Sequence, residues 1–87
     1  MTMKFVEPDV SALEIENVFN AKYPRYAGEL KVSLDNVVIT LAFRNIHCER
    51  NVAELMTGPG VIFTEKEYFW MNVLNTISRM VTYYEKM

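Results

Sequence analysis

Residues 30–44 carry the pattern that most constrains the fold, because apolar and polar side chains alternate along them in two successive runs. Such alternation is typical of β-strands with one buried face. Asp35 and Asn36 separate the runs, and both residue types tolerate the positive φ angles of a tight turn. We therefore predict an antiparallel hairpin with a two-residue Asp35–Asn36 turn and its apolar side chains on one face. The expected cross-strand pairs are Leu34–Val37, Val32–Ile39 and Leu30–Leu41.

A helix is predicted before the hairpin. The sequence SALE at residues 11–14 fits a capping box, in which the serine and glutamate side chains satisfy the first amide groups of a helix. Asp9 is a competing cap two residues earlier. Apolar residues then recur at helical spacing as far as Tyr23, and the proline that follows disfavours helical geometry there. We expect the helix to end at Lys22 or Tyr23.

The segment from residue 45 to residue 60 is compatible with two structures. After a continuation of the second strand, it forms either a third strand or one helical turn around Val52 to Met56. We favour a short third strand. The glycines and proline of TGPG, residues 57–60, then indicate a turn.

The last 24 residues predict a long helix. Its start is marked by TEKE, in which Thr64 and Glu67 form a second capping box. At 100° per residue, one apolar stripe is expected to lie across the apolar face of the hairpin and to form the core. The stripe consists of Trp70, Val73, Leu74, Ile77, Val81 and Tyr84.

The same helix carries more apolar side chains than this stripe. A helix of 24 residues is about 36 Å long, whereas a compact domain of this size is roughly 30 Å across, so we expect one end to overhang. Exposed aromatic and methionine side chains are typical of protein interfaces. The partner-binding residues predicted on this basis, with two carboxylates of the first turn, are Tyr68, Phe69, Met71, Met80, Tyr83, Met87, Glu65 and Glu67.

Composition narrows the class of protein. The chain has 87 residues and a net charge of −2, which argues against binding nucleic acid, because such binding depends on clustered Lys and Arg. No apolar run reaches the roughly 20 residues of a membrane helix, and there is one cysteine. We expect a single α+β domain over residues 1–87, cytoplasmic and not membrane-bound: an N-terminal helix, an antiparallel hairpin with a third strand, and a long C-terminal helix packed on the sheet.

The sequence offers few residues for catalysis. His47 and Cys48 are adjacent, so on a strand their side chains point to opposite faces and cannot form a Cys–His pair. They are too few to hold zinc within one chain, although a site shared across a symmetric dimer is conceivable. Arg44 and Arg50 form either a solvated strand end or a small anion-binding edge. We expect no enzyme activity, no metal and no cofactor.

These observations favour a non-enzymatic protein-binding module. The hypothesis is a small inhibitor or regulatory factor, of the kind carried by phages and mobile elements, that docks on and blocks a larger host protein such as a nucleic-acid-processing enzyme. One alternative is a homo-oligomeric structural or assembly subunit, because a small sheet leaves strand edges open for a homodimer. The other alternative is a small ligand-binding protein or enzyme, which requires a pocket with converging polar groups.

Overall fold

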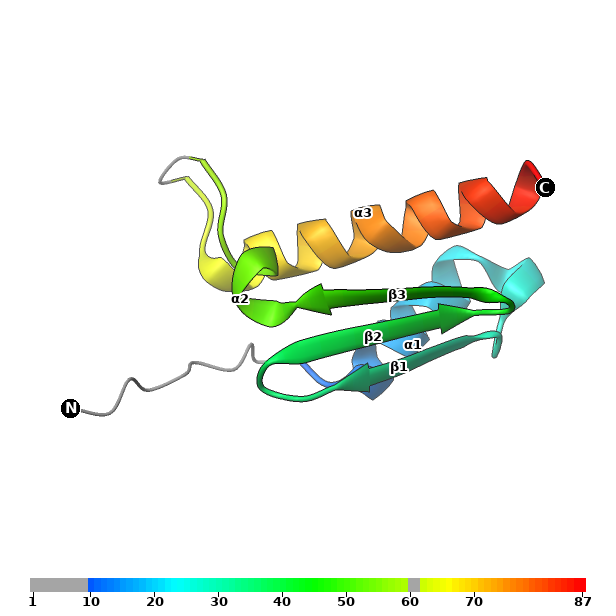
Figure 1. Ribbon diagram of the computed structural model, residues 1–87, viewed down its shortest axis with the longest axis horizontal. Helices are drawn as coiled ribbons and strands as arrows, with labels where there is room; N and C mark the ends of the chain where they lie inside the picture. Colours follow the sequence, from blue (N-terminus) through cyan, green and yellow to red (C-terminus); the bar gives the residue numbers. More distant parts are fainter. Residues whose placement is uncertain (1–9, 60–61) are drawn as a thin grey trace.

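The computed structural model describes residues 10–59 and 62–87, and within them helices and a three-stranded sheet enclose one core. Figure 1 shows the sheet with α1 behind it and α3 running along the molecule. Both long helices therefore cover the same apolar side of the sheet, and the predicted α+β fold is confirmed. The elements are α1 (Ala12–Lys22), a 3₁₀ turn η1 (Pro24–Tyr26), β1 (Leu30–Leu34), β2 (Val38–Phe43), β3 (Ile46–Asn51), α2 (Val52–Leu55) and α3 (Glu65–Glu85).

Both predicted helix starts are correct. The Ser11 hydroxyl accepts a hydrogen bond from the Glu14 amide at 3.2 Å, which caps α1. The competing cap at Asp9 lies outside the described residues. Thr64 and Glu67 form the full reciprocal capping box at the start of α3. Because these bonds satisfy amides that have no partner within a helix, they fix where each helix begins.

The predicted hairpin is present, but its register is wrong by two residues. The strands pair with Leu34 opposite Ile39 and Leu30 opposite Phe43. Asp35 lies before the turn rather than within it, because its carboxylate accepts hydrogen bonds from the amides of Val37 and Val38 at 2.7 and 2.6 Å. These two bonds hold the pKa of the Asp35 carboxyl below its ordinary value. A shift of two residues keeps every side chain on its predicted face.

The segment after β2, for which the sequence allowed either a third strand or a helical turn, contains both. β3 continues the meander and pairs antiparallel with β2, so the sheet order is β1-β2-β3. The tight turn between β2 and β3 places Arg44 at a φ of 55°, in the left-handed region. The chain then forms α2, one helical turn in which the Asn51 side chain accepts a hydrogen bond from the Ala53 amide at 2.9 Å.

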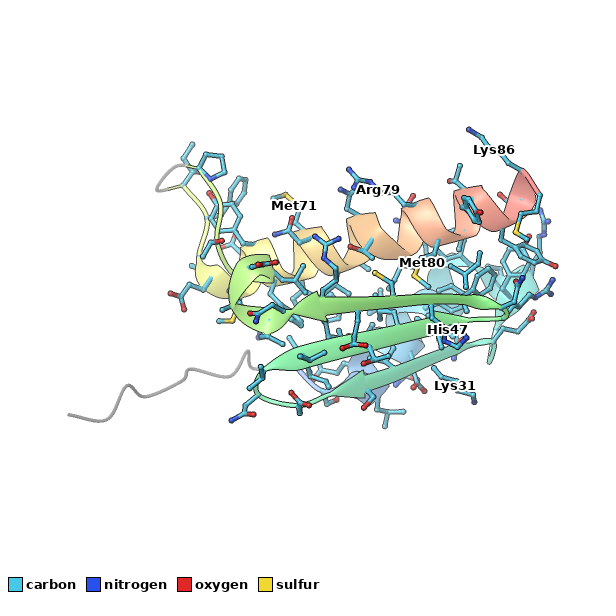
Figure 2. The ribbon with its side chains drawn as sticks, viewed as in Figure 1. Lys31, His47, Met71, Arg79, Met80 and Lys86 are labelled. Carbon is cyan, nitrogen blue, oxygen red and sulfur yellow. The ribbon has the colours of Figure 1, made fainter. Side chains whose placement is uncertain are left out.

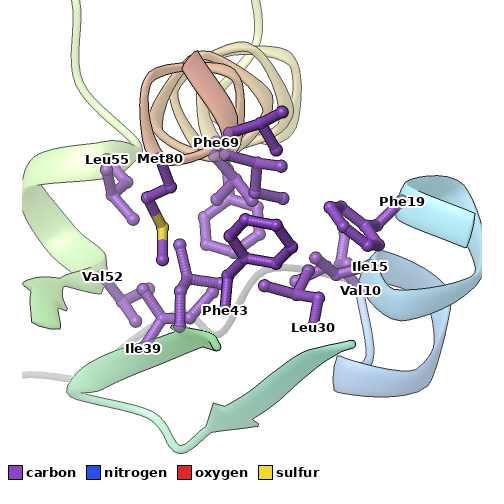
Figure 3. Close-up of a cluster of buried hydrophobic side chains, with 14 of the residues drawn as sticks. Val10, Ile15, Phe19, Leu30, Ile39, Phe43, Val52, Leu55, Phe69 and Met80 are labelled. Atoms are coloured by element: carbon purple, nitrogen blue, oxygen red, sulfur yellow. The ribbon is translucent and has the colours of Figure 1, made fainter. Parts of the chain in front are cut away.

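Apolar side chains from all the main elements meet between the sheet and α3. Figure 3 looks along α3 and shows Phe43 and Ile39 of β2 below it, Phe19 and Ile15 of α1 on one side, and α2 on the other. These side chains are almost completely inaccessible to solvent. The opposite face of the sheet carries the exposed side chains of Lys31, Ser33, His47 and Glu49. None of the helices in the described part of the chain is long and apolar enough to cross a membrane.

Candidate functional site

The predicted partner-binding residues of α3 do not form one surface. Tyr68, Phe69 and Met80 are buried, with 6%, 0% and 6% of their surface exposed. The expectation that these three side chains are exposed is therefore wrong. Phe69 and Met80 flank the predicted stripe on the side of α3 that faces α2 and the sheet, and both point into the core (Figure 3).

Tyr68 is buried for a different reason. By helical periodicity it belongs among polar residues on the solvent side of α3, but the loop before α3 folds over its ring. The Tyr68 hydroxyl donates a hydrogen bond to the carbonyl oxygen of Pro59 at 3.2 Å. Gly58 lies against the ring so closely that a Cβ there would come within 2.1 Å of it, and Phe63 contacts the ring edge-on. Helical periodicity carries no information about this loop.

Of the predicted partner-binding residues, the apolar side chains of Met71, Tyr83 and Met87 are exposed. Figure 2 shows Met71, Arg79 and Lys86 on the side of α3 that faces away from the sheet, whereas Met80 lies between helix and sheet. We call the solvent-facing row of Met71, Asn75, Arg79, Thr82, Tyr83 and Lys86 the outer face of α3. A shallow depression of about 300 Å³ lies on it, lined by Ser78, Arg79, Thr82, Tyr83 and Lys86.

The charge on the outer face is positive. No Asp or Glu occurs between residues 68 and 84, so Arg79 and Lys86 have no carboxylate neighbour in their own helical turns apart from Glu85. Glu85 is directed elsewhere, because it accepts a hydrogen bond from the Tyr26 hydroxyl at 2.9 Å and contacts Arg25 at 3.5 Å. The basic groups of the outer face are therefore available to a partner.

The predicted carboxylates lie at the opposite end of the helix from Tyr83. Glu67 is occupied by the capping box, in which it accepts from the Thr64 amide and hydroxyl. Glu65 is exposed in the same turn. Eighteen residues separate Glu65 from Tyr83, which corresponds to about 27 Å along a helix. The two groups therefore belong to different parts of the surface.

The C-terminal end of α3 is attached to the rest of the protein instead of overhanging freely. Arg44 donates hydrogen bonds to Glu29, at 2.8 Å for one pair of atoms, and to the Tyr84 hydroxyl. Its guanidinium also lies 4.5 Å from the centre of the Tyr84 ring, a favourable cation–π position. The side-chain hydrogen bond from Arg44 lowers the pKa of Glu29, and the same bond raises the pKa of Arg44.

This end cluster, which we define as Arg25, Tyr26, Glu29, Phe43, Arg44, Tyr84 and Glu85, was not foreseen from the sequence. An open depression of about 410 Å³ beside it is lined by Arg25, Tyr26, Tyr84, Glu85 and Met87. The opposite charges of the cluster are already paired with each other. We therefore interpret it as an anchor for the last turn of α3. Its sequence signal was weak, because the members come from four separate segments.

His47 and Cys48 point to opposite faces of the sheet, as predicted from their adjacency. His47 is exposed on the open face, and Cys48 is half-buried on the core side. In residues 10–59 and 62–87, no three His, Cys, Asp or Glu side chains are grouped as a metal site requires.

No family model, no curated protein and no solved structure matches the chain. A functional conclusion consequently depends on the geometry of the surface.

Proposed function

We propose that this chain is a non-enzymatic protein-binding module that docks on a larger protein through the outer face of α3. The observation that carries the proposal is the exposure of Tyr83, 62% of whose surface is open to solvent between Arg79 and Lys86. Tyrosine and arginine are enriched among the residues that dominate binding energy, because each offers a large contact area together with a polar group. We therefore place Tyr83 at the centre of the proposed docking surface, with Arg79 and Lys86 beside it.

The charge of the outer face indicates the chemistry of the partner. Arg79 and Lys86 lie one helical turn from Tyr83 on either side, so the matching surface has an apolar pocket for the tyrosine ring and carboxylates at its rim. The presence of Glu65 and Glu67 among the predicted partner-binding residues would instead imply basic groups on the partner, which is the reverse polarity. The revised polarity is preferred because Glu67 is occupied by the cap.

The size of the helix is compatible with a protein interface. α3 has 21 residues and is about 32 Å long, and specific interfaces bury about 800 Å² on each partner. A rigid helix also loses little conformational entropy on binding. Met71 extends the contact toward the N-terminal half, since it lies three helical turns before Tyr83 on the solvent side. Inhibition of a host enzyme, the finer role expected from the sequence, stays a prediction.

Site-specific photo-cross-linking tests this proposal. p-Benzoylphenylalanine is placed at position 83 in the full chain, within cells that naturally make the protein, and at position 31 as a control. Lys31 is exposed on the open face of the sheet and lies away from α3 (Figure 2). The proposal predicts one dominant adduct from position 83, absent from position 31 and lost when Arg79→Glu is added. Equal adducts from both positions, or an adduct that tolerates Arg79→Glu, would contradict it.

A further inference from the structure

The two edges of the sheet differ in how their backbone groups are satisfied. On the free side of β1, the Val32 amide donates a hydrogen bond to the Glu16 carboxylate at 3.0 Å, and α1 packs along the strand. On β3, the ladder bonds to β2 use Ile46, Cys48 and Arg50, as fixed by the Val52 amide bonding to the Val37 carbonyl. The amides and carbonyls of alternate residues therefore point away from the sheet.

These outward groups belong to His47, Glu49 and Asn51. Within the described ranges, none of their amides has a hydrogen-bond partner in the protein. The side of β3 that faces the core is also incompletely covered: Ile46 and Cys48 are half-buried and Arg50 is exposed. The paired residues of β2 are completely buried, because α3 packs more closely over β2 than over the outer strand. β3 is therefore an exposed edge strand, with backbone groups available to pair with another strand.

Charged side chains normally discourage pairing at such an edge, so their arrangement decides whether a partner strand fits. A second copy paired antiparallel about a two-fold axis must be centred on one of four residues: His47, Cys48, Glu49 or Arg50. Every centre places its own residue opposite itself, so the centres at Glu49 and Arg50 oppose two like charges, and the centre at His47 opposes two imidazoles and leaves Glu49 without a basic partner. Opposed like charges destabilise a strand pair.

The fourth centre is complementary. With Cys48 on the axis, His47 of each copy faces Glu49 of the other, and the symmetry forms this pair twice. The outward amides and carbonyls of both residues then bond across the seam, because they occupy hydrogen-bonded positions. Ile46 faces the Arg50 side chain, whose aliphatic stem covers apolar surface. The half-buried Cys48 side chains meet on the core side of a six-stranded sheet.

We infer that β3 pairs with β3 of a second copy of this chain, antiparallel and centred on Cys48. The partner is a second copy because the strand is self-complementary in this one register. The inferred pairing uses residues 46–50 of β3 and no residue of the outer face of α3. Docking through α3 and pairing through β3 are thus independent, and the failure of one leaves the other standing.

Moving the single cysteine along β3 tests the register. In the inferred pair, the two Cys48 Cα atoms occupy a non-hydrogen-bonded position about 4.5 Å apart, within the range that a disulfide spans. The comparison uses the natural chain, the double variant His47→Cys with Cys48→Ser, and the double variant Glu49→Cys with Cys48→Ser. At positions 47 and 49 the equivalent Cα atoms are separated by about 8 Å, which is too far. Diamide serves as the oxidant and takes up the two electrons and two protons of the thiols.

The inferred register predicts that position 48 cross-links at least about tenfold faster than positions 47 and 49. Random collision predicts the reverse order, because His47 and Glu49 are exposed and Cys48 is half-buried. Fastest cross-linking at 47 or 49, or equal rates at all three, overturns the inference. Circular dichroism of each reduced variant verifies that the fold is retained.

A charge exchange provides a second test that does not depend on the cysteine. Glu49→Lys places a lysine opposite His47 twice, and we expect the dimer dissociation constant in sedimentation equilibrium to rise by roughly tenfold. Adding His47→Glu to this variant restores opposite charges and is expected to restore the dimer. A dissociation constant that neither change moves, or a chain that is monomeric at every concentration, contradicts the inference.

Discussion

Both faces of α3 carry large apolar side chains, yet the fold buries those of one face and leaves those of the other in solvent. Phe69 and Met80 are enclosed between the helix, the sheet and α2, whereas Met71 and Tyr83 lie in solvent on the other side. Residue type alone does not tell the buried Met80 from the exposed Met71. What distinguishes them is which side of the helix β2 and α2 contact, which periodicity does not encode.

The largest expected difference between the faces is in stability. Phe69→Ala removes a ring that is completely buried and is expected to lower the free energy of unfolding by about 3–5 kcal/mol. Met71→Ala is the matched control on the outer face, and we expect a change within about 0.5 kcal/mol. Urea denaturation of both variants measures the difference. Similar losses from the two variants would show that the faces are not divided as described.

The next effect concerns Tyr68, which the loop before α3 covers on the solvent side of the helix. Gly58→Ala places a methyl group against its ring, where it would lie 2.1 Å from a ring carbon, and we expect a loss of about 1–3 kcal/mol. The same change in a Tyr68→Ala background is expected to cost clearly less, because the obstructing ring is gone. Equal costs in the two backgrounds would contradict the packing of Gly58 on Tyr68.

A smaller loss of stability is expected from changes at the start of α3, because the N-cap stabilises the helix as a whole and neither face in particular. Thr64→Ala removes the hydroxyl that accepts from the Glu67 amide at 3.2 Å, and N-cap losses of this kind cost about 1 kcal/mol. Ser11→Ala, at the corresponding position of α1, is the natural comparison. Thermal denaturation followed by circular dichroism measures both. No change in either variant would show that the caps do not determine where the helices begin.

The smallest effect is a pH dependence at the C-terminal end of α3, where Tyr84 is attached through Arg44. The pKa of Glu29 is lowered in the folded protein, so its contribution to stability is present above the unfolded glutamate value of about 4.3. This contribution is lost as the pH falls below the unfolded value and through the lower pKa that Glu29 has in the folded protein. The protection of the last turn of α3 against hydrogen exchange, relative to the intrinsic rate at each pH, should fall over this range, and Glu29→Gln should remove that part of the pH dependence. An identical pH response in the variant would contradict the role of the Glu29–Arg44 pair.

The local features of the fold were predictable from the sequence, because they depend on neighbouring residues. The caps at Ser11 and Thr64, the end of α1 at Lys22 and the alternation in the hairpin all involve residues close in the chain. The hairpin register was missed because Asp35 is equally suited to a place within the turn and to one before it. Its two hydrogen bonds to the following amides settle the choice in favour of the earlier place.

The surface was only partly predictable, because exposure depends on elements distant in the chain. Tyr83 and Met87 are exposed as expected, whereas Phe69 and Met80 are covered by β2 and α2, and Tyr68 by its own loop. The end cluster joins Tyr26, Arg44 and Tyr84 across nearly 60 residues. The ion pair between Arg44 and Glu29 was not predicted either, because the two residues are 15 positions apart and no sequence motif links them.

The most direct test of the docking face is a matched pair of substitutions one helical turn apart. Met80→Glu introduces a charge into the core, whereas Tyr83→Glu introduces the same charge into solvent. The account predicts that Met80→Glu unfolds the protein, while Tyr83→Glu keeps the unfolding midpoint and loses the partner captured by a photo-cross-linker at Met71. A folded Tyr83→Glu variant that still captures that partner would contradict the proposed docking face.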